Sequence, residues 1–249
     1  MLFSIITVVF NSRKELERTV HSIQNQSYKN FEHIIIDAAS TDDTIPFIKS
    51  LSFKNLKYLS EEDDGIYDGM NKGIELASGD YMLFLNAADT FANDHVLEDV
   101  AKSIEYSQPK IIYGGVNIYS ENGKFITGLN SFEFSKENLN KYGTRVVCHQ
   151  SIFVHTSIKK KYSEKYKFKG ELDWYYNLDK KVNKKNITVV DYAISNYFLG
   201  GIGDKKFWNN FFERIKVTKA HNKITEFFLI LPYLVIPIVF RLKRLMLKK

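Results

Sequence analysis

The chain has 249 residues, of which 44% are hydrophobic and 26% charged, a composition that excludes collagen-like, low-complexity and largely disordered proteins. Its single cysteine, Cys148, can form neither an internal disulfide nor a cysteine zinc site, so a reducing compartment fits best. The net charge of +6 is uneven, because residues 205–249 hold eleven Lys and Arg and two Glu, a net charge of +9, which leaves −3 on residues 1–204. This distribution argues against a nucleic-acid-binding protein, in which basic residues would spread over the body.

Short apolar runs alternate with helical patterns over the first third of the chain. The runs predict buried strands, and they lie at residues 3–10, 31–37, 56–59 and 81–85. Apolar residues at helical spacing predict helices between these strands, at residues 13–26, 41–52 and 66–77. This alternation predicts an α/β fold with a mostly parallel, doubly wound sheet.

The pattern loosens after residue 89. The sequence predicts a helix at 93–107, a strand at 111–113, a hairpin at 116–126, and helices at 172–182 and 207–220. We expect residues 1–115 to form one half of a domain, 116–204 its second half, and 205–249 a helical basic tail. The apolar run at the N-terminus is too short and wrongly flanked for a signal peptide, which argues against export.

Polar residues follow three of the predicted strands. Asn11 ends the first, Asp37 ends the second, and Asn86 and Asp89 follow the fourth. Ligands of open α/β sheets bind at the carboxyl ends of the strands, and acids gathered there repel one another unless a cation compensates. The first strand is followed by neither the Gly-rich dinucleotide fingerprint nor the Walker pattern, which argues against those two modes of nucleotide binding.

Three stretches, in order, resemble the family 2 glycosyltransferases of bacterial polysaccharide assembly: SIITVVFN, IIIDAASTDDT and SEEDDGIYDGMNKGIELASGDYMLFLNAAD. The resemblance is close over residues 1–115 and looser as far as 203. It implies the nucleotide-diphospho-sugar transferase fold called GT-A. It also implies inverting transfer of a hexose or N-acetylhexosamine from a nucleotide-diphosphate donor, foremost a UDP-sugar, to a lipid-linked or saccharide acceptor in lipopolysaccharide or capsule assembly.

The resemblance implies several donor-side roles. Asp37 matches the acid that contacts the nucleobase, with a turn cap as the alternative. Asp63 falls in the family's Glu-Pro-Asp-x-Gly stretch, where this chain has Glu62 in place of Pro. Asp89 matches the acid that holds Mg²⁺ or Mn²⁺ on the donor diphosphate, with a helix cap as the alternative, and Ala88 stands where many members have a second acid. The donor-binding residues implied are Thr7, Val9, Asn11, Asp37, Asp63, Asn71, Asn86 and Ala87.

Residues 170–175, GELDWY, resemble the family's acceptor-side motif, whose aspartate acts as general base. Asp173 is the better match and Glu171 the second choice. The alternative for both is an acid in a first helical turn, where the helix dipole favours it. The resemblance also places His149, Gln150 and Trp174 near the acceptor or the donor sugar, and residues 200–203 in a Gly-rich loop near the diphosphate.

Residues 227–240 form an uncharged apolar run that is followed at once by RLKRLMLKK. Crossing a bilayer takes roughly 20 apolar residues, and two prolines interrupt this shorter run. The pattern favours a segment lying in an anionic membrane surface, peripheral to the cytoplasmic face of the plasma membrane. The alternative is a C-terminal helix packed on the body or on a second subunit of a homo-oligomer. The residues expected at the membrane are Phe227, Phe228, Leu234, Arg241, Lys243 and Arg244.

Two functions of different class stay open at this point. The first is a metal-assisted glycosyltransferase, which Asp37, Asp89 and Asp173 favour. The second is a catalytically degenerate nucleotide-sugar-binding module tethered by its tail, which Ala88 favours. A nucleotidyltransferase is a more distant third, because the N-terminal region has no basic, Gly-rich triphosphate loop.

Overall fold

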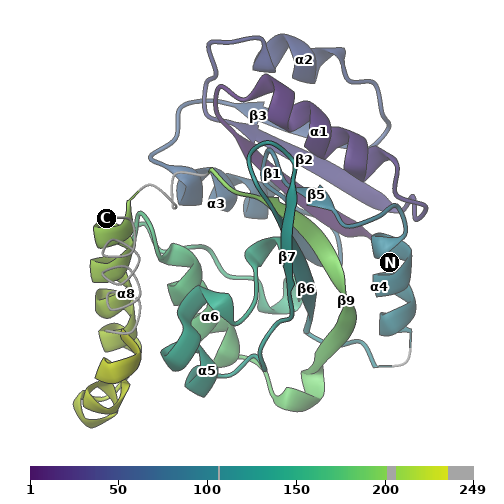
Figure 1. Cartoon of the computed structure of the whole chain (residues 1–249). Coiled ribbons are helices and arrows are strands. Elements are labelled where there is room, and N and C mark those ends of the chain that lie inside the picture. The colour runs from purple at the N-terminus through teal and green to yellow at the C-terminus, as the bar shows by residue number, and fades with distance from the viewer. Residues whose placement is uncertain (106, 201–205, 235–249) are drawn as a thin grey trace.

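The computed structural model describes residues 1–105, 107–200 and 206–234. They build one nine-stranded sheet in the order β3-β2-β1-β4-β8-β6-β9-β5, with β7 paired to β6 (Figure 1). The first four strands in this order are parallel to one another. They are β1 (Phe3–Val9), β2 (Phe31–Asp37), β3 (Leu56–Ser60) and β4 (Tyr81–Phe84).

Beyond β4 the sheet is mixed. β8 runs antiparallel to both β4 and β6, whereas β9 runs parallel to β6 and pairs with the short β5 at the edge. Strands from residues 116–204 therefore extend the same sheet that residues 1–115 begin. These later strands are β5 (Thr90–Phe91), β6 (Ile111–Tyr119), β7 (Phe125–Leu129), β8 (Ile152–His155) and β9 (Ile187–Phe198).

Helices cover both faces of this sheet, which confirms the predicted α/β class (Figure 1). One face carries α1 (Arg13–Gln24), α2 (Thr44–Ser50) and α4 (Val96–Ile104). The other carries α3 (Ile66–Leu76), α5 (Lys136–Tyr142) and α6 (Gly170–Asp179). α8 (Phe207–His221) packs against α6, and a further helix covers residues 224–234. Four 3₁₀ turns lie at Gly143–Arg145, His149–Ser151, Thr156–Ile158 and Lys184–Asn186.

The apolar strand sequences place a core on each face. Ile6 and Val8 of β1 point to the cluster that includes α3 and α6, while Phe3 and Ile5 point to the cluster that includes α4. α3 approaches β1 so closely that a Cβ at Gly73 would lie 2.3 Å from Ile6 Cγ2. This contact requires glycine in the DGMNKG stretch, and it brings the start of α3 to the carboxyl edge of the sheet.

The structure adds elements that the sequence pattern does not predict, namely β5, β8, α5 and β9. The predicted hairpin at 116–126 is present as the turn from β6 to β7. The predicted helix at 207–220 is α8, and it packs on the body rather than standing away from it. Of the described helices, none is long and apolar enough to cross a membrane. The Gly-rich residues 201–203 and the basic residues Arg241, Lys243 and Arg244 lie outside the described residues.

Candidate active site

Asp37 ends β2 with its side chain fully buried. Its Oδ2 accepts hydrogen bonds from Ser40 N (2.9 Å) and Ser60 Oγ (2.8 Å). Its Oδ1 is buried and accepts none from the described residues. Because an unpaired buried acceptor costs free energy, this oxygen is suited to accept from a ligand N–H.

Asn11 joins the loops that follow β1 and β2. It adopts a positive φ of 47°, which Asn tolerates better than most residues. Its backbone N–H donates to Ser40 Oγ (2.8 Å), and its side-chain Oδ1 accepts from Thr41 N (2.8 Å). The turn beside Asp37 is thereby held in one conformation from two strands.

Residues 86–89 form a tight turn after β4. Asp89 N donates to Asn86 O (3.0 Å), and Thr19 Oγ1 on α1 donates to Asp89 O (2.8 Å). Ala88 within the turn has φ 91°, a region that favours glycine, so the backbone is strained at this point. The strained turn directs the Asp89 side chain toward the protein interior at this edge of the sheet.

Asp89 is only 4% exposed, and each of its oxygens has one donor. Oδ2 accepts from Gln150 Nε2 (2.6 Å) and Oδ1 from Phe198 N (3.1 Å) at the end of β9. Burial raises the pKa of Asp89 to about 6, although both hydrogen bonds act to lower it. Gln150 is itself fixed, because Cys148 Sγ donates to its Oε1 (2.6 Å).

His149 links the turn at residues 86–89 to the first turn of α6. Its Nδ1 donates to Glu171 Oε2 (3.0 Å), and its Nε2 accepts from Asn86 Nδ2 (2.9 Å). Burial acts to raise the pKa of Glu171, but the hydrogen bond from His149 acts in the opposite direction, and the pKa lies below its ordinary value. Asn86 Oδ1 is buried without a hydrogen-bond partner among the described residues. His149 and Gln150, which the resemblance places near the acceptor or the donor sugar, thus lie beside Asn86 and Asp89 in the fold.

Glu171 stands in the first turn of α6, and two contacts fix that turn. Gly170 packs on the Tyr67 ring so closely that a Cβ there would lie 2.8 Å from Tyr67 Cε2. Glu213 of α8 accepts from three consecutive amides that precede the helix, Lys167 N (3.0 Å), Phe168 N (2.7 Å) and Lys169 N (2.9 Å). A carboxylate at this end also complements the helix dipole. No sequence motif signals Glu213, because its partners are backbone amides far away in the chain.

Asp173, the first choice for general base, is not part of this cluster. It is 8% exposed, accepts from His221 Nε2 (2.7 Å) on α8, and accepts from Asn177 Nδ2 (3.0 Å) within α6. The two acids are two positions apart on one helix, so they point in different directions and only Glu171 reaches His149. The structure therefore favours Glu171 for the acceptor-side role and gives Asp173 a place in the contact between α6 and α8.

Three other predicted site residues are engaged inside the protein. Thr7 is fully buried, donates to Leu85 O (2.8 Å) and lies 2.9 Å from His33 Nε2. Asn71 bonds both backbone groups of Tyr162, at 3.0 and 2.7 Å. Trp174 is 1% exposed and donates to Lys160 O (2.7 Å), so it is a core residue. Their polar groups are occupied in positioning neighbouring segments, and their place in a ligand site stays a prediction.

The remaining donor-side predictions lie close to the edge of the sheet. Val9 is 5% exposed and packs with α1 and α2, and the half-buried Ala87 packs against the same cluster. Asp63 is half-buried and accepts from Gly65 N (3.0 Å) at the start of α3. Burial raises the pKa of Asp63, while the Gly65 amide acts in the opposite direction.

The residues at this edge fit a divalent cation only together with an anionic ligand. Asp89 and the unpaired Asn86 Oδ1 are oxygen donors of the kind that Mg²⁺ and Mn²⁺ accept. Within the described residues, no group of three or more His, Cys, Asp or Glu could hold a metal ion. A cation here would take one or two protein ligands and complete its shell with diphosphate oxygens and water.

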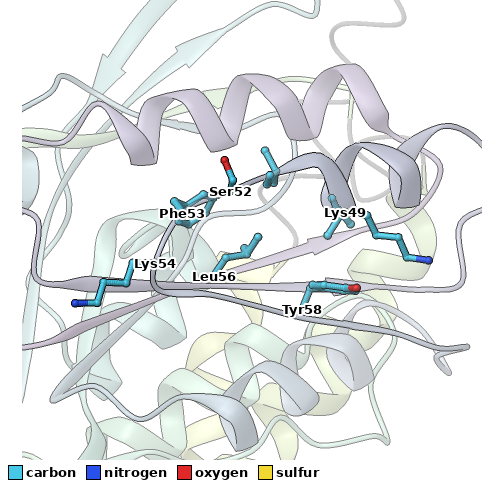
Figure 2. Close-up of a pocket in the computed structure, with 8 residues that line it drawn as sticks. Lys49, Ser52, Phe53, Lys54, Leu56 and Tyr58 are labelled. Atoms are coloured by element: carbon cyan, nitrogen blue, oxygen red, sulfur yellow. The ribbon is translucent and has the colours of Figure 1, made fainter.

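A separate surface pocket of about 500 Å³ lies between α2 and β3 (Figure 2). None of the predicted site residues lines it. Lys49 and Lys54 extend away from it in Figure 2. Its lining is Ile48, Lys49, Leu51, Ser52, Phe53, Lys54, Leu56 and Tyr58.

The sheet, parallel in its first half and mixed in its second, has the GT-A fold, which is the fold of nucleotide-diphospho-sugar transferases. The family model for glycosyl transferase family 2 matches residues 4–163. The chain belongs to glycosyl transferase family 2, and the resemblance seen in its sequence is confirmed.

Relatives of known sequence agree with this assignment. A PGL/p-HBAD biosynthesis glycosyltransferase of Mycobacterium bovis is 33% identical over 157 residues, which cover 61% of this chain and 58% of that protein. An uncharacterized glycosyltransferase of Mycobacterium tuberculosis is 38% identical over 107 residues, which cover 43% of this chain and 41% of that protein. The chain thus spans between two fifths and three fifths of the length of these curated relatives.

Solved structures show the same fold. Staphylococcus aureus TarS 1–349 in complex with UDP-GlcNAc superposes with a TM-score of 0.72 at 19% identity, covering 89% of this chain and 66% of that one. A mannosyltransferase of Pyrobaculum calidifontis, in complex with GDP-Man and Mn²⁺, gives a TM-score of 0.57 at 14% identity, covering 86% and 64%. At these identities the likeness establishes the fold.

Proposed function

We propose that this protein is an inverting glycosyltransferase that moves a sugar from a nucleotide-diphosphate donor to a saccharide acceptor. One observation carries the proposal: Asn86, in the turn that ends at Asp89, is joined through His149 to Glu171 on the acceptor-side helix. Donor-side and acceptor-side groups thus meet at one edge of the sheet, where ligands of α/β folds bind.

Asp37 supports a uracil-containing donor. Its buried Oδ1 has a free acceptor position at the end of β2. The imide N–H of uracil would satisfy that oxygen with a charge-assisted hydrogen bond. The TarS structures with UDP and UDP-GlcNAc share this fold, which is consistent with a UDP-hexose or UDP-N-acetylhexosamine donor here.

Asp89 and Asn86 would hold Mg²⁺ or Mn²⁺ on the donor diphosphate. When bound, the cation supplies neutralisation of charge on the leaving diphosphate. Gln150 and Phe198 keep the Asp89 carboxylate in place. Because the pKa of Asp89 is raised to about 6, its ionised form is favoured above that pH and gains most from a neighbouring cation.

Glu171 serves as the general base. The acceptor hydroxyl attacks C1 of the sugar on the face opposite the diphosphate, its proton passes to a Glu171 oxygen, and the bond from C1 to the diphosphate oxygen breaks with its electron pair leaving on that oxygen. The hydrogen bond from His149 orients Glu171 and keeps it ionised. Pre-arranged geometry of this kind accounts for a large part of catalysis in such transfers.

The acceptor we propose is a lipid-linked saccharide at the cytoplasmic face of the plasma membrane, in the assembly of a cell-surface polysaccharide. The apolar and basic C-terminal segment supports this placement. A catalytically degenerate nucleotide-sugar-binding module is the second candidate. It is favoured by Ala88 and by the fact that both Asp89 oxygens already have protein donors.

The test is release of nucleoside diphosphate from a panel of UDP- and GDP-sugars, with and without Mn²⁺ and saccharide acceptors. Glu171→Gln should lower acceptor-dependent release by about 10² to 10⁴ fold while donor binding is retained. Asp173→Asn is the matched control, and it should affect turnover less and unfolding more. Donor binding without release by the unaltered protein would support the degenerate module, and a larger loss in Asp173→Asn would reassign the base.

A further inference from the structure

Each of the two C-terminal helices exposes large apolar side chains. On α8, Trp208 and Phe212 are 48% and 56% exposed, one helical turn apart. On the helix over 224–234, Ile224, Phe228 and Leu229 are 71%, 63% and 77% exposed. Large apolar side chains rarely stay this exposed in succession unless they meet another surface. We call these five residues the outer face.

The opposite sides of the same helices are built into the body. Arg214 of α8 is 8% exposed and donates to the carbonyl oxygens of Asn140 (3.4 Å) and Lys141 (2.9 Å) at the end of α5. On the second helix, Ile230 and Leu234 are 6% and 1% exposed. Leu234 therefore turns inward, which corrects its predicted place at a membrane. The outer face belongs to helices whose orientation is fixed.

The charge around the outer face is positive. Lys216 and Lys219 of α8 and Lys223 beyond it are exposed. The two acids of the segment are both engaged, since Glu213 caps α6 and Glu226 forms a surface ion pair with Lys136. The chain continues beyond residue 234 with five more basic residues in its last nine. An anionic surface with an apolar interior complements this combination of charge and exposed apolar area.

We propose that the outer face docks on an anionic lipid bilayer, with Trp208 and Phe212 at headgroup level and the lysines against lipid phosphates. Trp208 is suited to this depth, because its indole has a large apolar ring and a polar N–H group. The phenyl ring of Phe212 fits the boundary between headgroups and acyl chains. Each lysine near such a surface adds attraction that falls off with salt. The sequence pattern places the membrane contact in residues 227–240, and the structure adds α8 to it.

Docking through α8 has a consequence for the reaction. Glu213 fixes the first turn of α6, and His221 binds Asp173 on the same helix. A bilayer bound to the outer face would therefore hold the acceptor side of the site at a constant height and orientation above the lipid. This part of the inference rests on the proposed function, whereas the docking itself does not.

The full chain carries its own probe for this contact. It has two tryptophans, of which Trp174 is 1% exposed and Trp208 is 48% exposed. Vesicles of phosphatidylglycerol and phosphatidylcholine should shift the Trp208 emission to shorter wavelength and sediment the protein. Trp208→Phe should abolish the shift but retain sedimentation. Vesicles of phosphatidylcholine alone should bind at least tenfold more weakly.

Variants separate the two components of binding. The double variant Phe212→Ser and Leu229→Ser should weaken vesicle binding by at least tenfold. The double variant Lys216→Gln and Lys219→Gln should weaken it by at least tenfold at low salt only, because salt screens the attraction of the lysines. Phe125→Ser, at a residue on β7 that is 53% exposed, is the matched control and should bind normally. Sugar transfer to a soluble acceptor, measured as release of nucleoside diphosphate, should be unchanged in all of these variants.

Three results would overturn the docking proposal. They are no sedimentation of the full chain with anionic vesicles, sedimentation with no change in Trp208 emission, and self-association that Phe212→Ser abolishes, which would make the outer face an interface between copies. Vesicle binding without any sugar transfer would leave docking intact and count against the proposed function. Sugar transfer without vesicle binding would support the proposed function and count against docking.

Discussion

Two buried carboxylates at different edges of the same sheet are treated in opposite ways. Glu32 and Asp89 are each 4% exposed. Glu32 accepts from Ser4 Oγ (2.6 Å), Ser78 N (2.7 Å) and Ser78 Oγ (2.8 Å), and pairs with Lys57 Nζ (2.6 Å). Among the described residues, Asp89 accepts only from Gln150 Nε2 and Phe198 N and has no paired cation. Glu32 therefore has three hydrogen-bond donors and a paired lysine, whereas Asp89 has two hydrogen-bond donors among the described residues.

The pKa values follow this difference. Burial acts to raise the pKa of Glu32, but Lys57, Ser4 and Ser78 together lower it to about 2. Burial raises the pKa of Asp89 to about 6, and its two donors do not offset that effect. Holding Asp89 ionised in the folded chain costs on the order of 3 kcal/mol. A carboxylate kept at this cost is suited to bind a cation, whereas a saturated one stabilises the fold.

The largest expected effect separates function from stability at these two positions. Asp89→Asn should lower sugar transfer by at least about 100-fold with the fold retained, because loss of transition-state charge stabilisation costs several kcal/mol. Glu32→Gln should keep turnover but lower the free energy of unfolding by about 1–3 kcal/mol. Turnover and denaturant unfolding of both variants are the measurements. Normal Mn²⁺-dependent turnover in Asp89→Asn would contradict the assignment.

The second prediction concerns pH. The pKa of folded Asp89, about 6, lies above the ordinary aspartate value of 3.8, so the folded state binds more protons between these two values. The free energy of unfolding should therefore fall as pH rises from about 4 to 6. The pKa of folded Glu32, about 2, lies below the ordinary glutamate value of 4.5. The free energy of unfolding should therefore fall, at this residue, as pH falls from about 4.5 to 2. Urea unfolding across pH 4–6 tests this. Asp89→Asn should remove the descending slope, and an unchanged slope would show that another group causes it.

The third prediction concerns the cap on α6. Glu213→Gln replaces an acceptor of three amides with a group that accepts less well, so the first turn of α6 should loosen. We expect about a tenfold fall in kcat with donor binding changed less than threefold. Glu226→Gln is the matched control, since Glu226 pairs with Lys136 at the surface and should have no effect. Equal losses in the two variants would argue against positioning by Glu213.

The smallest expected effect lies beside Asp89. Ala88 holds φ at 91°, a conformation that costs of order 1 kcal/mol or more for a non-glycine residue. Ala88→Gly should therefore raise the free energy of unfolding by about 1 kcal/mol. Ala77→Gly, at the ordinary φ of −69°, should lower it instead. A loss of stability in Ala88→Gly would mean that the methyl group contributes packing that outweighs the strain.

The first half of the fold could be predicted from sequence, because its strands are continuous apolar runs and its helices have regular spacing. β2, for example, spans the predicted residues 31–37. β9 could not be predicted, because its buried and exposed positions do not alternate regularly and its pairing with β6 shifts register near Gly115. Elements in the second half depend on partners far away in the chain, which a local pattern does not contain.

The candidate site shows the same division. Asp37, Asn86, Asp89, His149 and Gln150 follow from position at strand ends and from the family resemblance. The choice between Glu171 and Asp173 does not, because both lie in one turn and only the packing of α8 decides which faces His149. Glu213 could not have been found either, since a side chain that binds backbone amides leaves no trace in the partner's sequence.

The capping of α6 by Glu213 also bears on how the protein is made. Synthesis proceeds from the N-terminus, so the strand ends that carry Asn11, Asp37 and Asp89 emerge long before residue 213. Until then the amides of residues 167–169 lack their acceptor, and the turn that bears Glu171 has no support from α8. A nascent or prematurely ended chain would therefore complete the edge around Asp37 first and order the acceptor-side acid last, so that the two halves of the site mature at different times.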